Sequence, residues 1–151
     1  MPDRGSLEAR VRRLEAVESA RDLLHAYAAA CDRGDLEGLV GLFADGAVLD
    51  ANGAVYDGRA AIRQFYAPRL APVTRHFVTN ATFAATASGD IESRCLFLAL
   101  GANEGRSTLV IGNYADRIRV ERDGARFRSR VIRLGVATDL DTGWSDLPNL
   151  G

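Results

Sequence analysis

The stretch Tyr27-Ala28-Ala29-Ala30-Cys31-Asp32-Arg33-Gly34-Asp35 decides how the first half of this 151-residue chain folds. Apolar residues recur at helical spacing before it, and Ser6 with Glu8 close behind is a suitable start for a long helix. Gly34 is a typical residue after a helix end, because glycine adopts left-handed backbone angles at little cost. Asp35 can cap a second helix. The stretch therefore predicts a long helix, a sharp stop and a short second helix.

Asp32 stands in the last turn of the long helix, where the helix dipole is negative and a carboxylate is mildly unfavourable. Helix stability therefore does not explain why an aspartate occupies this position. The polar stretch Arg75-His76-Phe77-Val78-Thr79-Asn80 offers an explanation, since His76 is one of only two histidines in the chain. A histidine oriented by a carboxylate is a common general base near neutral pH. We therefore expect Asp32 and His76 to form a catalytic dyad.

The segments between these two stretches predict short elements. The second helix is expected to bury an apolar face and to stop at Asp45-Gly46; that face consists of Leu36, Leu39, Val40 and Phe43. Short strands at 48–49 and 55–56 flank a turn at 51–53, and a third helix follows Asp57-Gly58.

The second half of the chain reads as strands separated by glycine-containing turns. We expect these strands near residues 75–87, 91–102, 107–121 and 125–134. Consecutive hairpins make an antiparallel sheet, and helices followed by long strands favour an α+β domain with the helices on one face of a curved sheet. One domain over residues 1–151 is expected, with a core at 7–135. The tail at 136–151 carries Trp144 and Leu147, so it either docks on a pocket mouth or a second subunit, or frays in solution.

Composition excludes several classes of function. The net charge is −1, so the chain lacks a basic field for nucleic acid or an anionic membrane surface. All 19 basic residues are arginine, which removes lysine-nucleophile and Schiff-base chemistry. Cys31 and Cys95 lie in apolar contexts without metal-ligand spacing, which is typical of reduced, buried thiols in a cytoplasmic protein. No segment is apolar enough for a membrane span.

Several local patterns occur together in one order and spacing. They are Tyr27-x4-Asp32-Arg33-x-Asp35, Gly58-Arg59, Thr74-Arg75-His76 with Asn80, and Asp123-Gly124 before Arg130-Val131-Ile132-Arg133-Leu134. This layout resembles the SnoaL-like branch of the nuclear transport factor 2-like superfamily over roughly residues 7–135. The resemblance implies a cone-shaped half-barrel, in which a curved antiparallel sheet wraps around N-terminal helices and encloses a pocket.

Within that superfamily the chain is most similar to proteins of the scytalone dehydratase, hexachlorocyclohexane dehydrochlorinase and bile-acid 7α-dehydratase type. The resemblance implies that Asp32 orients His76, that His76 removes a proton, and that Tyr27 and Arg130 assist the leaving group. Proton removal by a histidine paired with a carboxylate needs no metal and no cofactor. An open curved sheet with apolar residues on its outer side and an apolar tail predicts a homo-oligomer, as a dimer or trimer. The Arg130 match depends on strand register, since a one-residue slip turns a side chain to the opposite face.

The substrate is expected to be a small, mostly apolar, cyclic hydroxylated or carbonyl compound. Asn80 lies four residues after His76, so strand alternation places both on one face. Candidates for the apolar wall are Phe43, Phe65, Phe77, Phe97 and Leu98. The predicted activity is that of a cofactor-independent lyase, and an isomerase or polyketide cyclase is the enzymatic alternative.

Each candidate residue also has a structural interpretation. His76 can be a strand histidine that hydrogen-bonds to neighbouring threonines. Asp32 can simply pair with a nearby arginine or accept a hydrogen bond from a backbone amide. Tyr27 can belong to the core with its hydroxyl at the rim. A noncatalytic ligand-binding or assembly domain, like the small subunit of ring-hydroxylating dioxygenases, is therefore the alternative from a different class.

Overall fold

The long N-terminal helix α1 spans Leu7–Arg33 in the computed structural model, which describes residues 6–70 and 73–143. Ser6 caps its start, since the Ser6 hydroxyl accepts a hydrogen bond from the Ala9 N–H at 3.2 Å. At its end Gly34 adopts φ +66°, and its N–H donates to the carbonyl groups of Ala30 and Cys31. Both predicted ends of the helix are therefore confirmed.

Helix α2 (Leu36–Gly41) begins as predicted, with Asp35 Oδ1 accepting a hydrogen bond from the Gly38 N–H at 2.8 Å. It ends earlier than predicted, however, because Phe43 opens strand β1 (Phe43–Ala51). Phe43 is aligned with Phe127 of a distant strand, and their ring centroids are 5.1 Å apart. Pairing with that strand, which the local apolar spacing does not encode, turns Phe43 from a helical residue into a strand residue.

The remaining elements follow in the predicted order. They are β2 (Ala54–Asp57), α3 (Gly58–Tyr66), β3 (Val73–Ala85), β4 (Ile91–Asn103), β5 (Arg106–Glu121) and β6 (Gly124–Asp139). The sheet has the order β2-β1-β6-β5-β4-β3. Strands β3 to β6 form the predicted antiparallel hairpins, whereas β1 pairs with β6 in parallel, which the sequence did not indicate.

Strand β6 is longer than the sequence indicates. Its polar end, Thr138-Asp139, reads as a loop, but these residues continue the ladder with β5 through the pairs Leu109–Thr138 and Thr108–Asp139. The expected tail therefore begins after residue 139. Residues 144–151, which include Trp144 and Leu147, lie outside the described residues.

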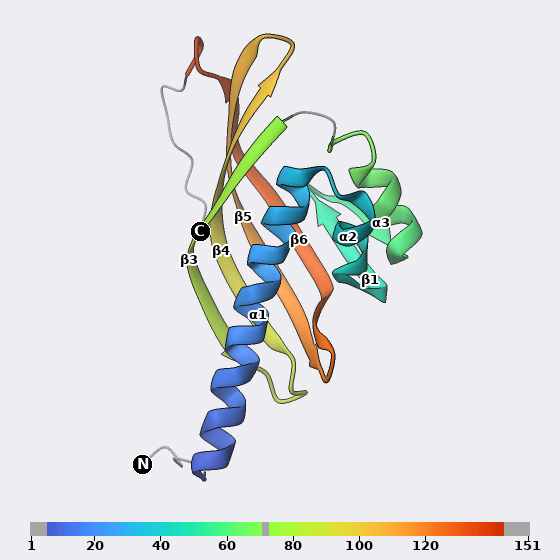
Figure 1. The fold of residues 1–151 in the computed structure, drawn as a ribbon, viewed down its shortest axis with the longest axis vertical. Coiled ribbons are helices and arrows are strands. Elements are labelled where there is room, and N and C mark those ends of the chain that lie inside the picture. The colour runs from blue at the N-terminus through green and yellow to red at the C-terminus, as the bar shows by residue number, and fades with distance from the viewer. Residues whose placement is uncertain (1–5, 71–72, 144–151) are drawn as a thin grey trace.

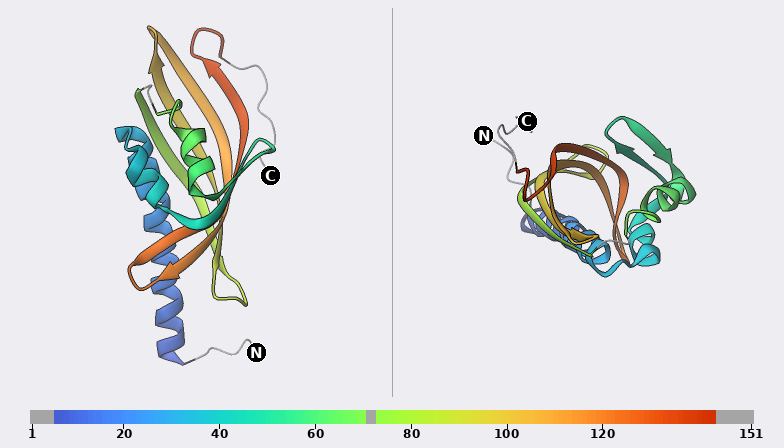
Figure 2. Two further views of the ribbon diagram at one scale, coloured as in Figure 1. Left: turned by 90° about the vertical axis from the view of Figure 1, so that its right-hand side faces the viewer. Right: turned by 90° about the horizontal axis from the view of Figure 1, so that it is seen from above.

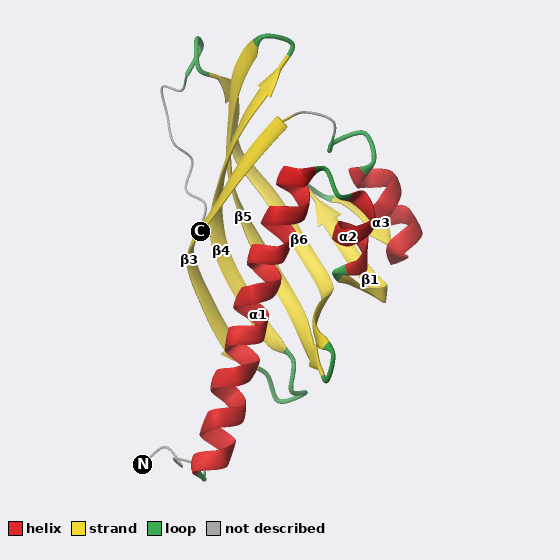
Figure 3. Ribbon diagram, viewed as in Figure 1, coloured by secondary structure: helices red, strands yellow, loops and turns green. Residues whose placement is uncertain are grey.

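The sheet curves around α1, which runs along its concave face (Figures 1 and 2). Helix α2 lies beside α1, and α3 lies beside α2, next to the β1–β2 end of the sheet (Figure 3). Leu24, Leu39, Ile62, Ile118 and Phe127 are fully or almost fully buried in the core between helices and sheet. The expected α+β architecture, with a curved sheet wrapped around N-terminal helices, is thus confirmed. Among the described helices, none is both long and apolar enough to cross a membrane.

Candidate active site

Asp32 and His76 are hydrogen-bonded to each other at the junction of α1 and β3. His76 Nδ1 lies 2.6 Å from Asp32 Oδ1, and the His76 backbone N–H donates to Asp32 Oδ2 at 3.0 Å. The Thr74 hydroxyl donates to Asp32 Oδ1 at 3.2 Å. The last turn of α1 thus holds the carboxylate against the first residues of β3. These three partners explain why an aspartate occupies an unfavourable helix end.

This geometry fixes how the imidazole of His76 is presented. A carboxylate only accepts hydrogen bonds, so the neutral ring carries its hydrogen on Nδ1, and Nε2 keeps the free lone pair. The two side chains are 14% and 20% exposed, so the pair is shielded but still reachable. Nε2 of His76 can therefore act as a proton acceptor.

A pocket of about 470 Å³ lies beside this pair. This volume is within the range of small-molecule sites. Most of its wall is apolar or aromatic, and the aromatic rings come from Tyr27, Tyr56, Phe65, Tyr66, Phe97 and Tyr114. The polar groups come from Asn52, Arg69, Thr74 and His76. Of the predicted residues, the structure brings Tyr27, His76, Phe65 and Phe97 into one pocket.

Three buried tyrosines form one side of this pocket. The Tyr27 and Tyr66 hydroxyl oxygens are 2.8 Å apart, and the rings of Tyr27 and Tyr114 meet edge to face at 5.6 Å. Burial raises the pKa of all three phenols above the usual value of 10.0. Because they stay protonated at neutral pH, they are hydrogen-bond donors rather than bases. The two hydroxyl groups share one hydrogen bond, in which either oxygen can be the donor.

The ring of Phe97 lies flat on Tyr114, with centroids 4.2 Å apart and an interplanar angle of 7°. Gly112 makes room for it, since a Cβ at Gly112 would come within 2.6 Å of the Phe97 ring. The His76 and Phe97 centroids are 6.5 Å apart. Phe97 thus fills the wall between the histidine and the tyrosines.

Arg130 does not line the pocket, contrary to the expectation that it touches the substrate. Its side chain is fully buried and forms two hydrogen bonds to Asp116, at 2.7 and 2.8 Å. The guanidinium lies about 4 Å from the ring centroids of Tyr27, Tyr114 and Phe127. Arg130 therefore stands behind the tyrosines as a structural cation. The register of β6 places Arg130 on the inner face of the sheet, but the rings of Tyr27 and Tyr114 separate it from the cavity.

Asn80 is also misplaced by the sequence analysis. It adopts φ +54° in a bulge of β3, where the pairing with β4 shifts between Thr79 and Thr82. The extra residue reverses the alternation of faces, so Asn80 is exposed rather than beside His76 on the inner face.

Three apolar candidates lie elsewhere. Phe43 is wholly buried against Phe127 and Tyr66, so it is core rather than pocket wall. Phe77 and Leu98 belong to the outer face of the sheet, because their neighbours His76 and Phe97 face inward. Burial and strand parity, which one sequence does not reveal, decide all three positions.

The sequence analysis missed Tyr66, Tyr114, Asn52, Thr74 and Arg69 as pocket residues. Helical spacing could have identified Tyr66 as an inward-facing residue, since it lies four residues after Ile62 on the same face of α3. Tyr114 had none, because the inward face of β5 depends on pairing with β4 and β6. Arg69 lies in the turn after α3, where no periodic pattern applies.

The two cysteines are free and buried, as predicted. Burial raises the pKa of the Cys31 and Cys95 thiols from 9.0 to about 11. Both thiols therefore remain protonated at neutral pH, although Cys31 lines the pocket. Protonated thiols are poor nucleophiles, which argues against covalent chemistry at Cys31.

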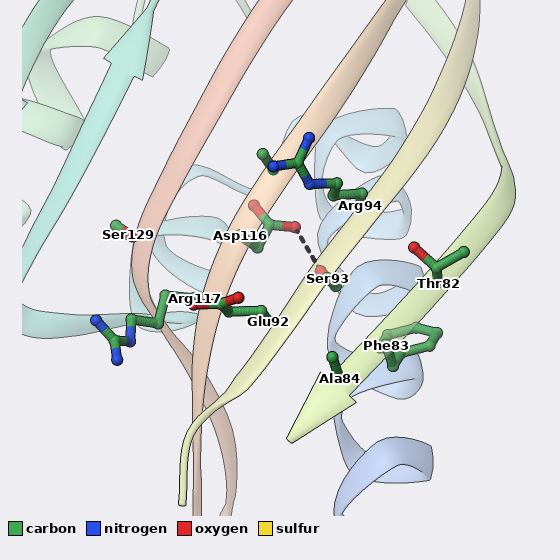
Figure 4. Close-up of a pocket in the computed structure, with 10 residues that line it drawn as sticks. Thr82, Phe83, Ala84, Glu92, Ser93, Arg94, Asp116, Arg117 and Ser129 are labelled. Atoms are coloured by element: carbon green, nitrogen blue, oxygen red, sulfur yellow. Dashed lines mark hydrogen bonds between the residues drawn. The ribbon is translucent and has the colours of Figure 1, made fainter. Parts of the chain in front are cut away.

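A second hollow of about 530 Å³ lies over β3, β4 and β5, with α1 seen behind these strands (Figure 4). Its lining is mostly polar and includes Glu92, Arg94 and Arg117. Ser93 and Asp116 are hydrogen-bonded to each other at its base. The described residues of its lining include no histidine and no general base oriented as His76 is, so the pocket beside Asp32 and His76 is the better candidate for a reaction.

Comparisons with known proteins agree with this fold. The protein-family model of the SnoaL-like domain matches residues 12–131 of this chain. No match is found among curated protein sequences. A solved structure from Novosphingobium aromaticivorans, named as a scytalone dehydratase, is 19% identical with a TM-score of 0.75, covering 95% of this chain and 96% of its own. A type 2 hexachlorocyclohexane dehydrochlorinase is 19% identical with a TM-score of 0.77, covering 93% and 99%.

A third solved structure, an NTF2-like protein with a cystatin-like fold from N. aromaticivorans, is 28% identical with a TM-score of 0.67. It covers 89% of this chain and 91% of its own. These likenesses show the fold, and the domain match spans most of the chain. The chain therefore belongs to the SnoaL-like family of the nuclear transport factor 2-like superfamily.

Proposed function

We propose that this protein is a cofactor-independent lyase of the dehydratase type, in which His76 removes a proton from carbon. The observation that carries this proposal is the 2.6 Å contact between His76 Nδ1 and Asp32 Oδ1 beside a pocket of ligand size. Asp32 holds the ring in one tautomer and stabilises the imidazolium that forms. The substrate is a small, mostly apolar, cyclic hydroxylated or carbonyl compound, in keeping with the aromatic wall.

The chemistry needs only groups that the chain supplies. Nε2 of His76 takes the proton, and the electrons of the broken C–H bond form a carbon–carbon double bond as hydroxide leaves the neighbouring carbon. The departing oxygen takes a proton from the imidazolium, which restores neutral His76, or from the Tyr27–Tyr66 pair, which then regains a proton from the imidazolium; either route releases water. A carbonyl next to the acidic carbon lowers the barrier by spreading charge onto oxygen, where a neutral phenol can donate a hydrogen bond.

An isomerase or cyclase would use the same base and differ only in where the proton returns. A noncatalytic binding domain would hold the ligand without breaking a bond. These outcomes separate when the protein is incubated in D2O with a panel of hydroxylated cyclic ketones. Loss of water by mass spectrometry indicates a lyase, whereas deuterium exchange or a shifted double bond without loss of water indicates an isomerase.

The decisive variant is His76→Gln, and the matched control is His25→Gln. His25 is the other histidine and is exposed on α1, away from the pocket. We expect His76→Gln to lose about 10²-fold or more of the rate, the usual share of a general base, while His25→Gln keeps the parental rate. Turnover at the parental rate by His76→Gln would falsify the proposal.

A further inference from the structure

Arg69 is held at the mouth of the pocket by contacts to the end of α3. Its backbone N–H donates to the Tyr66 carbonyl at 2.8 Å, and Nη1 donates to the Phe65 carbonyl at 2.6 Å. Its guanidinium also stacks on the Phe65 ring, 4.1 Å from the centroid. Phe65 and Tyr66 themselves line the pocket, so these contacts fix the cation beside the wall.

The charge of Arg69 has no partner among residues 6–70 and 73–143, since no carboxylate oxygen there lies within 4.0 Å of it. Two arginines that line another surface hollow, in contrast, are paired with carboxylates. Arg59 pairs with Asp45 at 2.5 Å and Arg126 with Asp123 at 2.7 Å. The lining of the pocket contains no aspartate or glutamate, and Arg69 is its only permanently charged side chain among the described residues. Among the residues that the structure describes, the permanent charge in the pocket lining is therefore positive.

The Arg69 guanidinium also has free hydrogen-bond donors for an anionic ligand. It carries five N–H donors, of which the Phe65 carbonyl takes one. Stacking on an aromatic ring reduces the rotamer freedom that an exposed arginine loses when it forms an ion pair. Guanidinium groups match planar carboxylates in particular, because two parallel N–H groups meet two oxygens.

We infer that the substrate carries a carboxylate, which Arg69 holds at the pocket mouth while the reacting carbon lies at His76. The proposed lyase thus acts on a cyclic carboxylic acid rather than on a neutral ring compound. The reaction at His76 rests on the proposed function. The binding of a carboxylate by Arg69 does not depend on it and can be tested separately. Arg69 is a specificity-determining residue and takes no part in the proton transfer.

The test compares two probes of equal size, naphthalene-2-carboxylate and its neutral carboxamide, by calorimetric titration at pH 7. We expect the carboxylate to bind about 5-fold more tightly, which is what a well-placed exposed ion pair supplies, and the preference to shrink with added salt. Arg69→Gln should remove the preference and leave carboxamide binding unchanged. Arg122→Gln removes the same charge from the exposed β5–β6 turn and should keep the preference.

His76→Gln separates this inference from the proposed function, because it should abolish turnover but keep the preference for the carboxylate. Equal binding of the two probes by the parental protein would overturn the inference, as would a preference that survives in Arg69→Gln. Failure of both naphthalenes to bind would also overturn it, since the aromatic pocket could then not hold a ring acid.

Discussion

The carboxylate of Asp32 holds His76 at two points, the ring Nδ1 at 2.6 Å and the backbone N–H at 3.0 Å. One side chain therefore sets both the position of the strand and the orientation of the imidazole. Structural and chemical roles are combined in Asp32, and different substitutions should separate them.

Asp32→Asn should keep much of the stability but little of the activity. The amide oxygen can still accept from the His76 backbone or from Thr74, but it has no charge to stabilise an imidazolium. Asp32→Ala should cost about 1–3 kcal/mol of unfolding free energy, because the partners lose their acceptor. Urea unfolding of both variants beside their turnover checks this. A similar loss of stability in both would contradict it.

Gly112→Ala should destabilise the protein by about 1–3 kcal/mol, the usual cost of overpacking. The new Cβ would approach the Phe97 ring to 2.6 Å and the Arg133 carbonyl to 2.5 Å. Gly46→Ala is the control, since nothing lies within 4 Å of a Cβ there. Thermal unfolding should separate the two variants clearly, and equal melting temperatures would show that Phe97 yields without cost.

Arg130→Met should be strongly destabilising, by about 3–5 kcal/mol, because it leaves the buried Asp116 carboxylate without its partner. Arg133→Met breaks a more exposed pair with Asp50 and should cost much less, because water screens the two charges. Chemical denaturation measures both. If Arg130→Met were as stable as Arg133→Met but inactive, Arg130 would have the direct catalytic role that its burial argues against.

Stability should fall as the pH rises from about 9 to about 11. The pKa of the Cys31 thiol is about 11 in the folded protein and 9.0 without the effects of burial, so the unfolded chain releases this proton first. The folded state then binds more protons, and the free energy of unfolding decreases with pH. Cys31→Ala should remove about 2 kcal/mol of this decrease. Identical pH profiles of unfolding for both proteins would refute the linkage.

Self-association as a dimer or trimer remains a prediction. On the outer face of the sheet, Phe77, Leu98 and Ile111 are aligned across three neighbouring strands, and Phe77 is 54% exposed. Such an apolar row favours contact with another subunit. Light scattering should report a mass above 16.3 kDa, reduced by Phe77→Ser but not by Val55→Ser on β2. A monomer at micromolar concentration would contradict this.

The sequence by itself determined the features that depend on neighbouring residues. Ser6, Gly34 and Asp35 set helix ends through local hydrogen bonds and backbone angles, and glycine turns set the hairpins. Asp32 was recognisable because it conflicts with its own helix end, and such a conflict is visible within one turn.

The tertiary structure alone decided which side chains reach the pocket. The bulge at Asn80 reverses strand parity, the parallel pairing of β1 with β6 draws Phe43 into a strand, and Asp116 retains Arg130 behind the tyrosines. Each outcome depends on partners far away in the chain, whose free energy of packing exceeds the small local preferences that a sequence displays.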